Sequence, residues 1–242
     1  MNPNSIVIQQ ASKRPDKLIL LFHGVGATPD SLLPLGHRLA AEFSQATVVS
    51  IAAPYASDVS LGYQWFSVLG VSENNRPARV AAAMPAFLSE VCAWQRSEDA
   101  TAATTVLIGF SQGAIMALES TSTVPSPAAQ VVAIAGRFAK LPVHAASHTK
   151  LHLLHGKLDA VIPYRHAIDT AHYLYELGDD VSADVLLNVG HQIDVAMIDL
   201  TVERLKGRDP QRNANLSGLL VKLEPLPTLA TPIEPKLTSA IN

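Results

Sequence analysis

Short apolar segments recur along the chain, and each is bounded by polar or turn-forming residues. They are rich in Val, Ile and Leu at consecutive positions, so both faces of each strand are apolar. This pattern is typical of a parallel sheet that helices cover on both sides. The predicted strands span residues 5–8, 18–22, 47–51, 105–109, 131–135, 151–154 and 181–187.

Segments with helical spacing lie between these strands. In the first of them, Leu32, Leu39 and Phe43 recur at intervals that place them on one face of a helix. The predicted helices span residues 31–44, 77–96, 112–120, 166–177 and 194–205. Because strands alternate with helices, we predict an α/β fold with a mostly parallel sheet, right-handed crossovers and helices on both faces.

Two segments do not fit this alternation. Residues 52–72 form a long loop with several aromatic side chains, and loops of that length are usually functional. Residues 208–242 contain five prolines and no sustained period, which predicts an extended or disordered tail. We therefore expect a single α/β domain over residues 1–207, with the tail outside it.

The composition narrows the class of protein. The chain has 242 residues, of which 48% are hydrophobic and 16% charged, enough to bury a core. A net charge of −3 without long runs of one sign predicts no nucleic-acid surface. The single cysteine, Cys92, excludes an intrachain disulfide and fits a reducing compartment. The first residues do not resemble a signal peptide, and the run 18–22 is too short to span a bilayer. We expect a soluble cytoplasmic protein without stable membrane insertion; the sequence sets no oligomeric state.

The segment Gly-Phe-Ser-Gln-Gly at 109–113 joins the predicted strand 105–109 to the predicted helix 112–120. This pattern is the nucleophile elbow, a strained turn that exposes a serine hydroxyl at the end of a strand. It predicts Ser111 as a nucleophile. The alternative is a glycine-rich turn that only connects strand and helix.

A serine nucleophile needs a base and an orienting carboxylate, which in this fold class follow in the order Ser, Asp, His. Asp159 follows the strand 151–154, and His191 follows the strand 181–187. All three residues therefore lie past the carboxyl ends of strands, where open α/β sheets bind ligands. As alternatives, Asp159 caps a turn and His191 is a surface histidine.

Other polar residues near these positions have plainer interpretations. Asp194 is a second candidate acid, but it follows His191 and is better placed as a helix N-cap. His23 and His155 each precede a glycine and are expected to be structural.

An oxyanion in this reaction needs backbone donors. One is expected from Gln112, the residue after the nucleophile, and the other from the glycine-rich loop after strand 18–22. In that loop the N–H of Val25, between Gly24 and Gly26, is the candidate. The alternative is that this loop is a glycine-rich turn that only joins the strand to the following helix.

Together, the motifs "FHGVG", "GFSQG", "HGKLDAVIP" and "GHQID" resemble the phospholipase/carboxylesterase family of α/β-hydrolases, which includes the acyl-protein thioesterases. The similarity runs from about residue 16 to 206. Within the family, "GFSQGAIMALES" and "QWFSV" resemble segments of a small bacterial esterase. Many relatives have Leu and Asp around the second glycine of "HGVGAT" and a glycine in place of Ala114, but these changes leave the proposed backbone donor intact.

The resemblance implies hydrolysis of carboxylic esters or thioesters by Ser111, His191 and Asp159 through an acyl-serine. The stretch between Ser111 and Asp159 leaves no room for a cap domain, so we expect an open groove for short to medium acyl chains. The aromatic residues of the 52–72 loop either line that groove or pack in the core beneath it; these are Tyr63, Trp65 and Phe66. The histidines lack metal-ligand spacing, and the chemistry needs no cofactor. The alternatives are a non-catalytic binding module of the same fold and an amidase or acyltransferase with the same elbow.

Overall fold

One sheet of seven strands organises residues 1–208, the part of the chain that the computed structural model describes. The order of its strands is β1-β3-β2-β6-β7-β8-β9. Their bounds are β1 (Ile6–Gln9), β2 (Leu18–Phe22), β3 (Thr47–Ile51), β6 (Thr105–Phe110), β7 (Gln130–Ile134), β8 (Lys150–Gly156) and β9 (Asp180–Leu186). Strand β1 runs antiparallel to β3 at one edge, and the other pairs are parallel.

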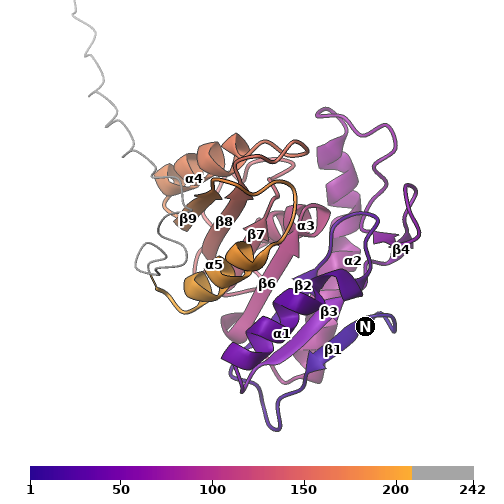
Figure 1. The fold of residues 1–242 in the computed structure, drawn as a ribbon, viewed down its shortest axis with the longest axis vertical. Helices are drawn as coiled ribbons and strands as arrows, with labels where there is room; N and C mark the ends of the chain where they lie inside the picture. The colour runs from indigo at the N-terminus through magenta and orange to yellow at the C-terminus, as the bar shows by residue number, and fades with distance from the viewer. Residues whose placement is uncertain (209–242) are drawn as a thin grey trace, which may run out of the picture.

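Helices cover both faces of the sheet. On one face lie α2 (Arg76–Ser97), α3 (Gln112–Ser120) and α4 (Arg165–Leu177), packed around a buried cluster that includes Phe22 and Phe87. On the other lie α1 (Leu33–Glu42) and α5 (Val195–Leu205), around a cluster that includes Leu39 and Met197. Figure 1 shows α1 and α5 on the near face of the sheet. The predicted α/β fold is therefore confirmed, and the fully buried strands β2 and β3 explain why both of their faces are apolar.

The elements differ from the sequence-based expectations mainly in short segments, among them a 3₁₀ turn at Ala102–Thr104 that was not predicted. The first predicted helix is preceded by a short 3₁₀ turn at Pro29–Leu32, because a proline at the start favours a tight first turn. The predicted loop 52–72 contains a small antiparallel pair, β4 (Tyr55–Ala56) and β5 (Tyr63–Gln64).

Two further expectations concern membrane insertion and the C-terminal tail. No helix within residues 1–208 is long and apolar enough to cross a membrane. The predicted proline-rich tail, 208–242, lies outside the described residues apart from its first position.

Candidate active site

Ser111 forms a strained turn between β6 and α3. Its backbone has φ 52° and ψ −114°, a conformation that L side chains rarely adopt. The two glycines permit this turn, because the chain passes very close to its neighbours there. A Cβ on Gly113 would lie 2.1 Å from the carbonyl oxygen of Phe22, and one on Gly109 would lie 2.4 Å from the amide nitrogen of Ala114. These close approaches explain why both positions are glycine.

The loops after β8 and β9 bring Asp159 and His191 to this serine. The Ser111 hydroxyl lies 2.9 Å from His191 Nε2, and His191 Nδ1 lies 2.7 Å from Asp159 Oδ2. An ionised carboxylate only accepts hydrogen bonds, so Nδ1 carries the proton and Nε2 is free to accept from the hydroxyl. Residues that are far apart in the sequence thus form one continuous hydrogen-bonded chain.

Asp159 is held by more than the histidine. Its side chain is fully buried, and Oδ1 accepts hydrogen bonds of 2.8 Å from the amides of both Val161 and Ile162. Burial alone would raise the pKa of Asp159, but the hydrogen bonds from His191 and the two amides outweigh it and hold the pKa below its usual value. The carboxylate therefore caps its own turn and contacts the histidine, so the two interpretations of Asp159 describe one arrangement.

His155 also supports Asp159, a contact that the sequence analysis did not predict. Its Nε2–H donates to the carbonyl of Ile162 at 2.8 Å and lies 3.1 Å from Asp159 Oδ2. Burial lowers the pKa of His155 despite these contacts, which keeps the ring neutral. The available signal was its position four residues before the acid.

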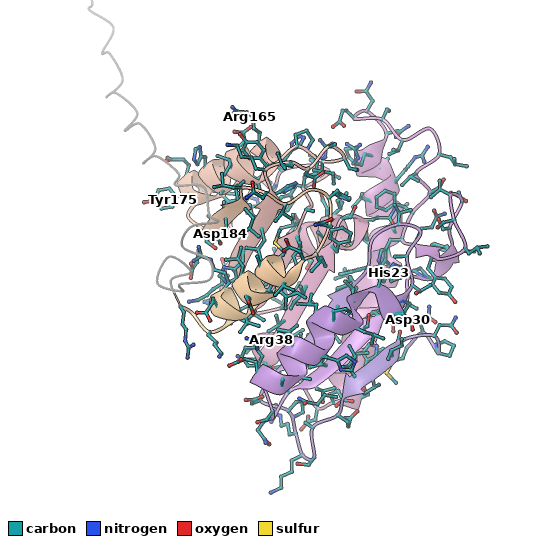
Figure 2. The ribbon with its side chains drawn as sticks, viewed as in Figure 1. His23, Asp30, Arg38, Arg165, Tyr175 and Asp184 are labelled. Carbon is teal, nitrogen blue, oxygen red and sulfur yellow. The ribbon has the colours of Figure 1, made fainter. Side chains whose placement is uncertain are left out.

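His23 has the structural role expected of it. Its ring is fully buried at the end of β2 (Figure 2). Nδ1–H donates to the carbonyl of Gly24 at 2.8 Å, and Nε2 accepts from the amide of Ala53 at 3.1 Å. Burial lowers the pKa of His23, so the neutral ring joins the loop after β2 to the loop after β3.

The two residues expected to supply oxyanion donors line the same cavity as Ser111. Gln112 is the first residue of α3, where backbone N–H groups lack acceptors inside the helix. Val25 lies in the loop after β2, which passes so close to the elbow that a Cβ on Gly24 would lie 3.2 Å from Ser111 Cβ. Hydrogen bonds of 2.8 Å from Gly26 N to Tyr63 O and from Tyr63 N to Ala27 O hold that loop in place.

The side chain of Gln112 has a separate role. Its Oε1 accepts from the amide of Trp65 and its Nε2 donates to the carbonyl of Phe66, both at 2.8 Å. The residue after the nucleophile therefore anchors the 52–72 loop over the elbow. Nothing in the local sequence indicated this, because the partners lie in another part of the chain.

The three aromatic residues of that loop lie in different surroundings. Phe66 lines the cavity of about 310 Å³ beside Ser111. Trp65 is 1% exposed and packs edge-on against Phe22 and Phe87 in the core. Tyr63 lies with its ring centroid 6.3 Å from that of His23. Of the expected groove residues, the structure places Phe66 at the cavity and Trp65 in the core.

The remaining polar candidates are accounted for by local structure. Asp194 is the N-cap of α5 and accepts a hydrogen bond from the amide of Met197 at 2.9 Å, as its position after His191 suggested. Within residues 1–208, no three His, Cys, Asp or Glu side chains gather as metal ligands would.

Fold and site together define a member of the α/β-hydrolases. A family model described as phospholipase/carboxylesterase matches residues 3–206. The chain belongs to this family and is a carboxylic ester hydrolase. It is 41% identical over 211 residues to esterase YpfH of Escherichia coli (strain K12), the small bacterial esterase that its motifs resemble. That alignment covers 87% of this chain and 91% of the relative.

Solved structures have the same fold. The crystal structure of esterase PE8 superposes with a TM-score of 0.78 at 26% identity, covering 84% of this chain and 98% of that one. A carboxylesterase of Bacillus cereus superposes with a TM-score of 0.72 at 16% identity, covering 84% and 93%. The second likeness concerns the fold alone.

Proposed function

We propose that the protein is a serine esterase that hydrolyses short- to medium-chain acyl esters or thioesters through an acyl-serine intermediate. The observation that carries the proposal is the hydrogen-bonded chain from Ser111 through His191 to Asp159. In this mechanism Ser111 attacks the acyl carbon while His191 Nε2 takes its proton. His191 then protonates the leaving group, and afterwards activates the water that releases the acid.

Asp159 orients His191 and stabilises its protonated form. Its lowered pKa supports this role, because the carboxylate stays ionised while the imidazole gains a proton. The N–H groups of Val25 and Gln112 are proposed to bind the oxyanion, and removal of one such donor typically costs about 3–4 kcal/mol of transition-state stabilisation. Positive potential at the start of α3 acts in the same direction.

The size of the cavity supports the proposed substrate range. A volume of about 310 Å³ is at the lower end of ligand sites, which run from roughly 300 to 1,000 Å³. No helix lies between α3 and α4 in the described chain, so no cap covers the site. An accessible alcohol or thiol leaving group fits this open arrangement. The exposed free thiol of Cys92 suits a reducing compartment, and we place the enzyme in the cytoplasm.

The test combines active-site labelling with turnover. A fluorophosphonate probe should label Ser111 when the site is located by mass spectrometry, and p-nitrophenyl butyrate and a butyryl thioester should be hydrolysed. Ser111→Ala should abolish both the labelling and the hydrolysis. Ser182→Ala is the matched control, because Ser182 also contacts a histidine but lies in the middle of β9.

The outcomes separate the alternatives. Absence of label and turnover in folded protein would favour a binding module. Cleavage of butyryl anilide or transfer of the acyl group to an added alcohol would favour an amidase or acyltransferase.

A further inference from the structure

The cavity beside Ser111 has a charged group of residues in its wall in addition to apolar ones. Arg76, the first residue of α2, and Arg137, in the loop after β7, both line it. Glu73 and His166 line the same cavity and contact these arginines. The triad chemistry described above uses none of these four residues, which we call the arginine cluster.

A single exposed carboxylate serves both guanidinium groups. Arg76 Nη1 lies 2.5 Å from Glu73 Oε1, and Arg137 Nη2 donates to the other oxygen of Glu73. The side chains of Arg76 and Arg137 are 17% and 12% exposed, whereas that of Glu73 is 72% exposed. The positive charges are therefore largely shielded from water, and their partner is largely in water.

The arginine cluster carries a net positive charge. Arg137 Nη1 lies 3.0 Å from His166 Nε2, and because a guanidinium only donates, this nitrogen of His166 accepts and the ring is neutral. Two arginines then face one carboxylate. The charged side chains that line the cavity therefore sum to a net charge of +1.

From this arrangement we infer that the arginine cluster selects substrates that bear a carboxylate in addition to the ester or thioester bond. The inference rests on the proposed esterase function. A guanidinium binds a carboxylate through parallel hydrogen bonds, and such contacts are strongest where water is excluded. Because Glu73 is the exposed partner, a substrate carboxylate that takes its place would keep both arginines paired while Glu73 moves into solvent.

The lining also indicates how the substrate is built. Apolar side chains such as Phe66, Val68 and Ile115 share the cavity with Ser111 and the arginine cluster. A short aliphatic segment that separates the ester bond from the carboxylate would contact them. The carboxylate belongs either to the acyl chain, as in a half-ester of a dicarboxylic acid, or to the leaving group.

The experiment compares matched charged and neutral esters. Mono-4-nitrophenyl adipate and its methyl-blocked ester test a charge on the acyl chain. The butyryl ester of 4-hydroxybenzoate and that of its methyl ester test a charge on the leaving group. We expect the wild-type enzyme to prefer the charged member of one pair in kcat/KM. Arg137→Gln should reduce that preference about tenfold or more, mainly through KM, because a charge-assisted hydrogen bond to the charged ester alone is lost.

Two further variants distinguish recognition from a structural role. Glu73→Gln removes the competing carboxylate and should increase the preference for the charged ester. If the ion pairs only held the loops together, Glu73→Gln would instead lower turnover of charged and neutral esters alike. Arg96→Gln is the matched control. It removes the same charge, but Arg96 is exposed near the far end of the helix that begins with Arg76.

Equal turnover of charged and neutral esters in both pairs, unchanged by Arg137→Gln, would overturn the inference while leaving the esterase proposal intact. A binding measurement is independent of turnover. Adipate, but not hexanoate, should raise the melting temperature of the wild-type protein and have less effect on Arg137→Gln. Equal effects of the two acids would also overturn the inference.

Discussion

Two clusters within residues 1–208 each combine a serine, a histidine and an aspartate, and the first has the geometry of a catalytic site whereas the second does not. In the first, Ser111, His191 and Asp159 form a continuous hydrogen-bonded chain at the carboxyl ends of the strands. In the second, His152 on β8 bonds to Ser182 on β9 with 2.9 Å between Nδ1 and Oγ.

The aspartate of the second cluster binds a different partner. Asp184, labelled on β9 in Figure 2, accepts two hydrogen bonds of 2.6 Å from Arg204 of α5. The other ring nitrogen of His152, Nε2, is buried and has no hydrogen-bond partner within residues 1–208. Ser182 lies within the extended strand β9 and not at a turn from a strand into a helix.

The comparison shows that residue types do not make the site. A strand end lets the backbone bend, as at Ser111, and brings loops from several strands to one place. In the middle of a strand, side chains follow the pleat and are covered by a helix. The same three residue types there stabilise packing between β8, β9 and α5.

The largest expected effect is on catalysis, from the aspartate of the first cluster. Asp159→Asn should lower kcat/KM for p-nitrophenyl butyrate about 10⁴-fold, because an amide favours the wrong histidine tautomer. The variant should remain folded by circular dichroism. A loss below tenfold would mean that Asp159 does not orient the histidine.

Acidification should lower the free energy of unfolding through His152 of the second cluster. Burial lowers the pKa of His152 to about 4, with a further contribution from the positive charge of Arg204. In the unfolded chain His152 takes up a proton below about pH 6.5, whereas in the folded protein it stays neutral down to about pH 4. The free energy of unfolding is therefore at its full value above about pH 6.5 and falls by on the order of 3 kcal/mol toward pH 4 from this residue alone.

Urea denaturation at pH 7.5 and pH 5 measures this effect. His152→Gln should have a smaller difference between the two pH values than the wild-type protein. His144→Gln, which changes an exposed histidine, is the control. An unchanged pH dependence in His152→Gln would show that other groups are responsible.

The smallest expected effect is that of Asp184→Asn. Loss of one charged partner leaves Arg204, whose side chain is 22% exposed, without its ion pair. We expect the free energy of unfolding to fall by about 1–3 kcal/mol, with kcat per folded molecule unchanged. Urea denaturation and active-site titration provide the two readouts. A large loss of kcat in folded protein would contradict the separation of the two clusters.

Much of the architecture was predictable because it depends on local chemistry. Continuous apolar runs predicted the buried strands, and helical spacing predicted the helices between them. The elbow at Ser111 and the order of the three residues placed Ser111, Asp159 and His191 at strand ends. The parallel sheet then brings them together, because its carboxyl ends meet at one edge.

Contacts between distant segments that do not follow from the order of the strand ends were beyond the reach of the sequence. Trp65 and Phe66 are neighbours with the same aromatic character and both are buried, yet only Phe66 of the two also lines the cavity beside Ser111. Gln112 anchors both through its side chain, although it lies more than 40 residues further along the chain.

The sequence by itself determined the sheet, the helices and the residues that the sheet edge collects, because hydrophobic period and turn chemistry act over short distances. Only the tertiary structure decided which polar side chains share a cavity. Arg76 and Arg137 lie far apart in the chain and on separate elements, and no local pattern links them. The closing of loops over the sheet edge places both beside Ser111, and that placement gives the site its charge.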